Sequence, residues 1–445
     1  MTEVSAGDNA AAGVPMSNPD MLLTLHEQKD GHSVTWAELD DGRILRTGGG
    51  FFYSEDGGLS WSEHFLPKDE KGEDMVGGSL SLVKLSGGSI GLAHITNPPD
   101  LSNNYGRRAE FRRSKDGGRT WSKPIAISPP GLSVNALQDV LLRTSSGRLI
   151  YPTYMGIGQG SFRHENAPFV GGYVNGHFVS TDAHFFDPHF GASVVFYSDD
   201  EGQTWQRNHD GEIFILLQKD TAREDTYEPS VTEVTPGKLL MMFRTRLGRY
   251  FQSWSSDNGE TWTRPQPTQL AGVQAPCQVR TFRDTGHLLC VFTQHSEDEI
   301  RRGYIRQRLS SAVSRNGGGV WEYFQNVESI LKGTHVEPGP IRYVRPEQCR
   351  SMGELPAPEN DARYCAALPE NYGRWSYPSV LVLNDRVLIS HTYSTWRTET
   401  GLATKEEAEH NSRLKVLPMS WFYGGQDPAV QSPVLDKLTK LAPKP

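Results

Sequence analysis

The stretch SKDGGRTW at residues 114–121 decides the fold, because it is one copy of a repeat. Other copies read SEDGGLSW at 54–61, SDDEGQTW at 198–205 and SSDNGETW at 255–262, and a degraded copy reads SRNGGGVW at 314–321. The copies begin at residues 54, 114, 198, 255 and 314, which gives intervals of 60, 84, 57 and 59 residues. Self-similarity at such a period indicates a repeat architecture, in which each copy contributes one supersecondary unit.

The chemistry of the repeat predicts a turn rather than a catalytic site. Each copy follows a strand-like run, its Asp can accept backbone N–H bonds within the turn, and its Gly supplies unusual dihedral angles. The Trp that ends the motif opens the next strand and is suited to burial between sheets. We therefore expect structural roles for Asp56, Asp116, Asp200 and Asp257, and burial at equivalent positions for Trp61, Trp121, Trp205 and Trp262.

A second, weaker repeat consists of an apolar strand, a tight turn and another apolar strand. Its six copies are centred on Gly42, Gly88, Gly147, Gly237, Gly286 and Asp385. Short turns between apolar or alternating strands are hairpin signals. Six hairpins, five of them followed by the first motif, predict an all-β fold: a six-bladed β-propeller. A seven-bladed ring and a parallel solenoid are the alternative architectures.

The boundaries of the propeller follow from where the repeats begin and end. We expect a flexible N-terminal tail over 1–18, a single propeller over 19–424 and a C-terminal tail over 425–445, with insertions near 156–190 and 325–374. The runs at 21–28 and 413–424 are candidates to close the ring between the last and first blades. The first insertion is rich in His and aromatic residues, which favours an ordered lid that stacks on a sugar over a metal site.

The composition argues against several classes of function. The net charge is −8 and the pI is near 6.0, whereas nucleic-acid-binding proteins present a basic face. No apolar run is long enough to cross a membrane. The first residues lack the features of a signal peptide, so we expect a cytoplasmic protein, or a secreted one whose signal has been trimmed.

The four cysteines show no zinc-binding spacing, and we expect no metal or cofactor. Cys277 and Cys290 lie in strand-like runs, where buried free thiols are expected. Cys349 and Cys365 bracket a loop and are a candidate disulfide if the protein is exported.

Residues at the start of the first strand of each blade should converge on the mouth of the central channel, because these strands line it. In this register Asp139, Glu228 and Tyr377 are the members that can carry protons. The second strands return to the same mouth, where the chain places His94, Tyr154, Arg244, Arg246 and Thr392.

These residues resemble the active site of the sialidase (neuraminidase) superfamily, whose β-propellers carry the same turn motif, called the Asp box or BNR repeat. The stretch TYEPSVTEVTPGKLLMMFR resembles the family segment with the catalytic Glu and a substrate-binding Arg, which implies those roles for Glu228 and Arg244, with Arg246 nearby. The run RQRLSSAVSRNGG resembles the segment with another Arg. Arg306 fits that position best and Arg308 is the alternative, while YPSV resembles the segment with the nucleophile and implies Tyr377.

The resemblance implies an exo-acting glycoside hydrolase that cleaves a terminal acidic sugar such as a sialic acid. Arginine side chains can hold the substrate carboxylate through charge-assisted bonds. A Tyr that a nearby Glu deprotonates replaces the usual carboxylate nucleophile, which the charge of the substrate would repel. A carboxylic acid of raised pKa then protonates the leaving oxygen.

The sequence departs from the family pattern at two points. The family's Arg-Ile-Pro segment, which supplies a further arginine, is absent, and Arg107 or Arg108 is the substitute that the chain offers. The family's acid is an Asp shortly before an Asp box, for which Asp100 is the best match and Asp139 the runner-up.

These departures keep two other interpretations open. One is a related propeller enzyme, such as a uronate-directed hydrolase or a polysaccharide lyase, and the other is a carbohydrate-binding propeller without catalytic activity. In each of them the expected partner is a carbohydrate. The oligomeric state stays open.

Overall fold

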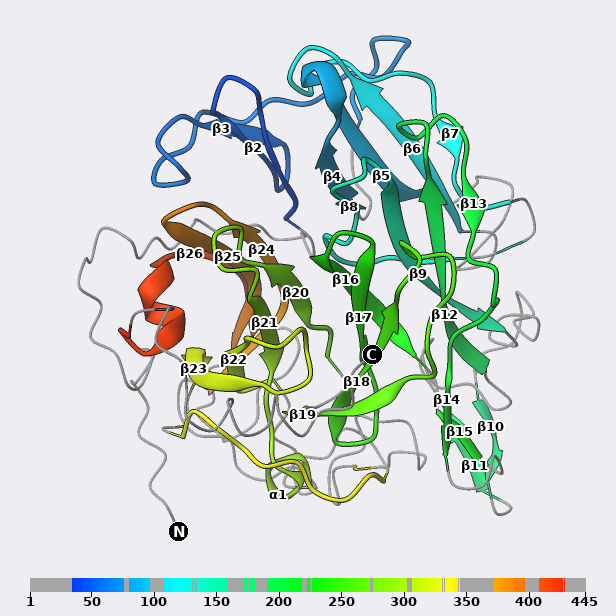
Figure 1. The fold of residues 1–445 in the computed structure, drawn as a ribbon, viewed down its shortest axis with the longest axis vertical. Coiled ribbons are helices and arrows are strands. Elements are labelled where there is room, and N and C mark those ends of the chain that lie inside the picture. The colour runs from blue at the N-terminus through cyan, green and yellow to red at the C-terminus, as the bar shows by residue number, and fades with distance from the viewer. Residues whose placement is uncertain are drawn as a thin grey trace.

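Six β-sheets arranged around a common centre form the computed structural model of this chain (Figure 1). Four of the sheets contain four strands and two contain three, which confirms the predicted six-bladed β-propeller. The structure describes residues 34–75, 80–96, 107–129, 132, 134–157, 171–174, 177–180, 190–217, 222–224, 226–272, 275–301, 306–329, 331, 333–342, 344, 372–396, 408–426 and 428.

The blades follow one another in chain order. Blade 1 contains β1 (Trp36–Glu38), β2 (Ile44–Thr47) and β3 (Phe51–Ser54), and blade 2 contains β4 (Leu80–Lys84), β5 (Ile90–Thr96), β6 (Arg108–Ser114) and β7 (Ile125–Ala126). Blade 3 contains β8 (Leu142–Arg143), β9 (Leu149–Ile157), β12 (Phe190–Ser198) and β13 (Gln206–Arg207). Blade 4 contains β16 (Tyr227–Thr235), β17 (Lys238–Arg244), β18 (Arg249–Ser255) and β19 (Gln266–Ala271).

The last two blades complete the ring. Blade 5 contains β20 (Gln278–Thr281), β21 (Leu288–Thr293), β22 (Arg308–Ser314) and β23 (Glu322–Ser329), and blade 6 contains β24 (Tyr372–Val382), β25 (Arg386–Trp396) and β26 (Ala408–Pro418). The remaining elements are the hairpins β10 (Gly171–Val174) with β11 (His177–Ser180) and β14 (Ile215–Leu217) with β15 (Ala222–Glu224), and the short helices η2 (Ser86–Gly88), α1 (Glu297–Arg301) and η4 (Met419–Tyr423).

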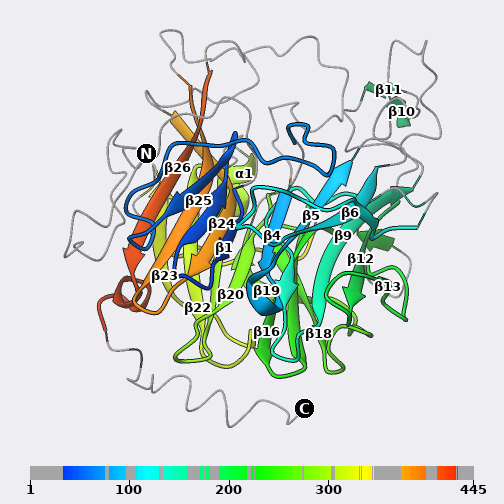
Figure 2. The same cartoon turned by 90° about the horizontal axis from the view of Figure 1, so that it is seen from above.

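Each blade is an antiparallel meander, so its strands run alternately between the two faces of the ring (Figure 2). The turns after the first strands and the Asp boxes after the third strands therefore lie on one face, which we call the Asp-box face. The starts of the first strands and the ends of the second strands lie on the other, which we call the mouth face. Hairpin β10–β11 and helix α1 interrupt connections on the mouth face.

The core lies between the blades, as the alternation of side chains along β17 illustrates. Leu239, Met241 and Phe243 pack with residues of blade 3. Leu240 and Met242 point the other way and pack with residues of blade 5. Because successive side chains of a strand point to opposite faces, a continuous apolar run is what a strand covered on both sides requires.

The Asp boxes are structural turns, as predicted. In the second box the Asp116 carboxylate accepts hydrogen bonds from Arg119 N–H at 3.1 Å, Thr120 N–H at 2.9 Å and the Thr120 hydroxyl at 2.6 Å. The Ser114 hydroxyl accepts the N–H of Gly118, whose φ is +94°. The degraded fifth copy keeps this geometry with Asn316 in place of Asp, because an amide oxygen can accept the same N–H bonds.

The prediction that all four box tryptophans are buried is wrong for two of them. Trp121 and Trp262 are buried, whereas Trp61 and Trp205 are only half-buried. Trp121 is covered by the end of blade 1, where its backbone N–H donates to Lys68 O at 2.9 Å. The blade before Trp61 is blade 6, which has three strands in the described part of the chain and so offers less cover.

The ring closes between blades 6 and 1 through side chains. An apolar cluster joins Trp36 and Ile44 of blade 1 to Leu388 and Val416 of blade 6, and the Trp36 indole N–H donates to Ser379 Oγ at 2.6 Å. The predicted closing run at 413–424 supplies the end of β26 and helix η4, and the run at 21–28 lies outside the described residues.

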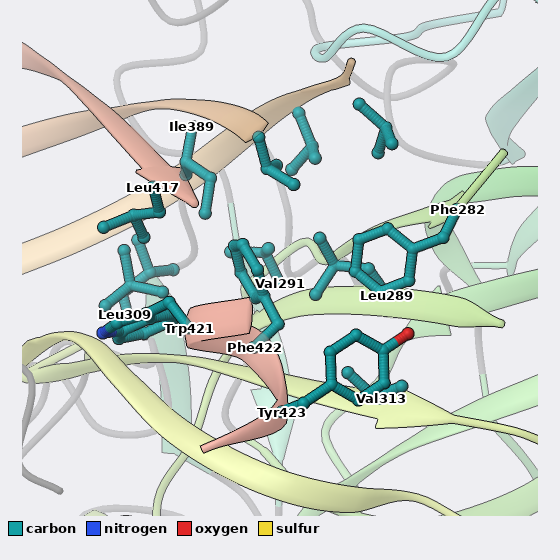
Figure 3. Close-up of a cluster of buried hydrophobic side chains, with 14 of the residues drawn as sticks. Phe282, Leu289, Val291, Leu309, Val313, Ile389, Leu417, Trp421, Phe422 and Tyr423 are labelled. Carbon is teal, nitrogen blue, oxygen red and sulfur yellow. The ribbon is translucent and has the colours of Figure 1, made fainter. Parts of the chain in front are cut away.

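Helix η4 folds back onto blade 5 after the last strand. Trp421, Phe422 and Tyr423 are buried against Phe282, Leu289 and other residues of blades 5 and 6 (Figure 3). This contact anchors the end of the last blade against blade 5. No helix in the described ranges is long and apolar enough to span a membrane.

Candidate active site

Tyr377 and Glu228 meet at the mouth face although they lie 149 residues apart in the sequence. The Tyr377 hydroxyl donates to Glu228 Oε1 at 3.0 Å. Both residues lie in the first strands of their blades, β24 and β16, and both are followed by Pro-Ser-Val. The strand pairing shifts register at each of the two positions, which is the signature of a β-bulge that re-aims a side chain.

The backbone at this site is strained. Six described residues other than glycine have positive φ: Glu201, Glu228, Asn258, Arg306, Tyr323 and Tyr377. Glu201 and Asn258 occupy the turn position that glycine takes in the other Asp boxes, so the fold accounts for them. Three of the remaining four are the predicted site residues, with φ of +44° at Glu228, +71° at Arg306 and +50° at Tyr377.

This strain points to function, because such a conformation costs about 1–3 kcal/mol at each residue and clusters at active sites. Glu228 and Tyr377 also precede prolines, which push the preceding residue toward extended angles with negative φ. The fold therefore imposes on Glu228 and Tyr377 a positive φ that is disfavoured both by their side chains and by the prolines that follow them.

Arg244 forms a buried ion pair with Glu228. Its Nη1 donates to Glu228 Oε2 at 2.5 Å, and both side chains are buried. Burial is the largest single influence and would lower the pKa of Arg244, but the Glu228 carboxylate, its hydrogen bond and the nearby Tyr377 and Tyr154 together outweigh burial and raise it. Removing Arg244 would leave a buried carboxylate without its cation, so we expect this residue to contribute to stability as well as to the site.

Arg306 lies beside the nucleophile candidate. Its guanidinium carbon is 5.5 Å from the centre of the Tyr377 ring. Its backbone oxygen accepts the Trp375 N–H at 2.7 Å, which ties the left-handed turn to β24. Burial and the Glu228 charge raise the pKa of Tyr377, while Arg244 and Arg306 lower it, and the net direction is upward.

The two alternative arginines lie in other surroundings. The Arg308 guanidinium is buried and donates to Glu299 on α1 at 2.9 Å. Burial lowers the pKa of Arg308 and the Glu299 carboxylate opposes that effect. Arg246 is half-buried, and its backbone oxygen accepts the Val344 N–H at 3.3 Å. Of these candidates, Arg306 is the one whose guanidinium lies over Tyr377.

Asp139 lies in the centre of the channel, enclosed by other blades. Its carboxylate accepts hydrogen bonds from Thr35 at 2.5 Å, Ser81 at 3.0 Å and Ser379 at 3.4 Å, and it pairs with Arg280 at 3.3 Å. Burial raises its pKa, and Arg280 opposes that effect. A carboxyl group bonded on both oxygens by protein donors is poorly suited to protonate a leaving group. Asp100, the other acid candidate, lies outside the described residues.

Tyr154 extends the site on the side of blade 3. It is buried, and its pKa is raised first by burial and then by the charges of Glu228 and Tyr377. Arg107 is close enough to influence the Tyr154 hydroxyl, whereas Arg108 lies in β6. The Asn135 amide donates to this hydroxyl at 2.8 Å. Asn135 was not predicted, and its pairing with Tyr154 across two segments left no motif to find it by.

Two of the four cysteines lie within the described residues. Cys277 and Cys290 are buried free thiols. Cys349, Cys365 and most of the His-rich insertion lie outside the described residues. Within the described ranges, no three or more His, Cys, Asp or Glu side chains are grouped so that they could hold a metal ion.

Comparisons with known proteins give the family and the fold of the chain. Residues 52–389 match the family described as BNR repeat-like domain. A sialidase of Bacteroides fragilis is 24% identical over 349 residues, which are 71% of this chain and 55% of that protein. The chain thus spans about half the length of this curated relative.

The solved structures that resemble the chain share its fold. Hadza microbial sialidase Hz136 superposes with a TM-score of 0.52 at 14% identity, over 87% of this chain and 65% of that one. A mutant of the NanB sialidase from Streptococcus pneumoniae gives a TM-score of 0.50 at 13% identity, over 91% of this chain and 71% of that one. At these low sequence identities, the structural similarity shows the propeller fold alone.

Proposed function

The chain belongs to the family of BNR repeat-like domains, and from this premise we propose that it is a sialidase-type glycoside hydrolase that removes a terminal acidic sugar. The observation that carries the proposal is the hydrogen bond of 3.0 Å between the Tyr377 hydroxyl and the Glu228 carboxylate, held by strained backbone on both sides. A sialidase of Bacteroides fragilis among its relatives supports the same class of reaction.

Tyr377 is the proposed nucleophile and Glu228 its base. The phenol oxygen attacks the anomeric carbon while its proton passes to Glu228 Oε1, and the bond to the leaving oxygen breaks. The distance between the two groups lies within the range needed for such a proton transfer. Because the net shift raises the pKa of Tyr377, the phenol stays protonated at neutral pH until the base removes its proton.

Arg244 and Arg306 are the proposed cationic side of the site. Arg244 balances the Glu228 charge and Arg306 lies over the Tyr377 ring, so two cations flank the Glu228–Tyr377 pair. An acidic sugar brings a carboxylate next to its anomeric carbon, and a guanidinium can hold that group with parallel charge-assisted bonds. A neutral sugar has no carboxylate with which a guanidinium could form these bonds.

Asp100 is the proposed acid that protonates the leaving oxygen, since the alternative, Asp139, is occupied by four donors. Asp100→Asn should slow the hydrolysis of substrates with poor leaving groups far more than that of activated aryl glycosides, because only the former need protonation. Equal losses on both classes of substrate would remove Asp100 from the mechanism.

The test of the proposed function is a hydrolysis screen. Aryl glycosides of sialic acids, uronic acids and neutral sugars are incubated with the full chain, beside an assay for the unsaturated products of a lyase. We expect aglycone release from an acidic sugar that Tyr377→Phe abolishes. Release from neutral sugars alone, unsaturated products, or release that persists in Tyr377→Phe would contradict the proposal.

A further inference from the structure

Buried polar groups from all six blades are linked by hydrogen bonds next to the candidate active site. Each blade contributes one buried polar side chain at or just before its first strand: Thr35, Ser81, Asp139, Ser230, Gln278 and Ser379. We call this set the channel ring. Three of its members bond to the backbone of the next blade: Thr35 Oγ1 accepts Leu82 N–H at 2.7 Å, Ser81 Oγ accepts Leu141 N–H at 2.7 Å, and Ser230 Oγ accepts Val279 N–H at 3.1 Å.

Asp139 is the one carboxylate of the channel ring and joins four blades at one point. Its oxygens bond to Thr35 of blade 1, Ser81 of blade 2, Arg280 of blade 5 and Ser379 of blade 6. Its backbone oxygen also accepts hydrogen bonds from the Gln278 amide and from Arg280. Ser379 lies two residues after Tyr377, so Asp139 constrains the strand that carries the nucleophile candidate.

Gln138, the neighbour of Asp139, constrains the base candidate. Its Nε2 donates to the backbone oxygen of Glu228 at 3.3 Å and to that of Cys277 at 3.0 Å. The orientation of the amide is fixed by chemistry, since its oxygen in the same place would face two carbonyl oxygens. The Glu228 carbonyl belongs to a residue with a strained φ of +44°. A hydrogen bond to this carbonyl stabilises the strained conformation.

We propose that Gln138 and Asp139 are positioning residues, which hold the backbones of Glu228 and Tyr377 so that the carboxylate and the phenol stay within hydrogen-bonding distance. Neither residue touches the reacting atoms. The inference rests on the proposed function for its effect on turnover, but the tethering itself concerns the Glu228–Tyr377 pair and exists whatever the substrate is.

A positioning role and a general-acid role for Asp139 predict different kinetic effects when the residue is replaced. The loss of an acid penalises poor leaving groups selectively. The loss of a positioning residue misplaces nucleophile and base, and therefore slows all substrates by a similar factor.

The experiment uses the full chain with tyrosine labelled at its phenolic carbon, observed by heteronuclear NMR. Comparison with Tyr377→Phe assigns the Tyr377 resonance, whose position reports the hydrogen bond to Glu228. Gln138→Met keeps the length of the side chain and removes the donor. We expect it to move the Tyr377 resonance and to lower kcat by about 10- to 100-fold on good and poor leaving groups alike, with KM little changed.

Thr232→Val is the matched control. Thr232 is buried on the same strand as Glu228, and its hydroxyl bonds to that of Thr281 at 2.8 Å, an equivalent contact between blades 4 and 5 nearer the Asp-box face. We expect this variant to lose a comparable amount of stability while the Tyr377 resonance keeps its wild-type position. If Gln138→Met also leaves the resonance in place, or lowers kcat no more than the control does, the positioning role is overturned.

Ser379→Ala provides a second variant if Gln138→Met does not fold. It removes one contact of Asp139 on the strand of Tyr377, and we expect a smaller movement of the same resonance. An unmoved resonance here overturns the inference. Should the full chain hydrolyse no substrate, the proposed function fails, while the resonance still decides whether the tether holds the pair.

Discussion

The two faces of the ring use left-handed backbone for opposite purposes. On the Asp-box face, Glu201 and Asn258 have φ near that of Gly57 and Gly117 in the same motif position, so the turn accepts glycine or a side chain. On the mouth face, Glu228 and Tyr377 hold the strained backbone in strands, and their side chains bond to each other. The left-handed conformation is part of a repeated structural turn on the Asp-box face, whereas on the mouth face it positions the side chains of the candidate active site.

This difference indicates which positions of a repeat protein are available for function. A common set of hydrogen bonds recurs in every Asp box: the Ser hydroxyl donates to the Asp or Asn side chain and accepts the Gly N–H, and the Asp or Asn oxygen accepts a backbone N–H four residues later. The copy with Asn316 keeps these bonds, although Val320 has no hydroxyl to add the further bond that Thr120 makes. The mouth is built from departures from the repeat, because the position before Pro-Ser-Val carries Glu228 in blade 4 and Tyr377 in blade 6. Substitutions should therefore separate the faces, with effects on activity at the mouth and effects on stability at the boxes.

Tyr377→Phe should give the largest effect. The phenyl ring keeps its packing but loses the nucleophilic oxygen, so we expect kcat to fall by at least about a thousandfold with little change in substrate binding or melting temperature. Steady-state kinetics measures kcat and KM, and thermal unfolding measures the melting temperature. Activity within tenfold of the parent would break the contrast between the faces, since about tenfold is within reach of repositioning alone.

Arg244→Ala should combine both kinds of effect. It removes the cation that balances buried Glu228, and breaking a buried pair in this way costs about 3–5 kcal/mol. Denaturant unfolding measures the loss, and Glu228→Gln in the Arg244→Ala background removes the uncompensated charge. We expect the second change to recover part of the stability and none of the activity. A stable, active Arg244→Ala protein would contradict the ion-pair account.

Asp116→Ala should affect stability alone. The turn loses the acceptor for Arg119, Thr120 and Ser114, and we expect a cost of about 1–2 kcal/mol with unchanged kcat. Burial raises the pKa of Asp116, but the bonds from Thr120 and Ser114 outweigh it and bring the pKa below its ordinary 3.8.

The sign of that pKa shift predicts a pH dependence. Because the folded-state pKa is depressed, the contribution of Asp116 is fully present above about pH 4 and is lost as the pH falls through the folded-state value. The stability difference between the parent and Asp116→Ala, measured by denaturant unfolding, should therefore shrink on acidification in that range. A difference that grows toward low pH would contradict the turn assignment.

Asn258→Gly should have the smallest effect. Glycine relieves the left-handed strain at φ +60° but loses the Asn258 bond to Ser146 at 2.9 Å, so the two changes offset each other to within about 0.5 kcal/mol. Thermal unfolding and kcat should both stay near the parental values. A large loss of activity would show that the Asp-box face contributes to the site.

The fold was predictable because its determinants are local and repeated. The turn motifs and the six hairpins fixed the blade count before any contact was known, and the register placed Glu228 and Tyr377 at one mouth. The contacts that depend on neighbouring blades were not predictable. Whether Trp61 is buried depends on the three-stranded blade before it, and whether Asp139 is a free acid depends on donors from four other blades.

The most direct measurement of the central claim is covalent trapping of the nucleophile. The full chain is incubated with a sialic-acid analogue that carries fluoride as the leaving group on its anomeric carbon and a second fluorine on the adjacent carbon, and its peptides are examined by mass spectrometry. We expect a glycosyl adduct on the peptide that contains Tyr377, absent in Tyr377→Phe. An adduct on another residue, or one that persists in Tyr377→Phe, would contradict it.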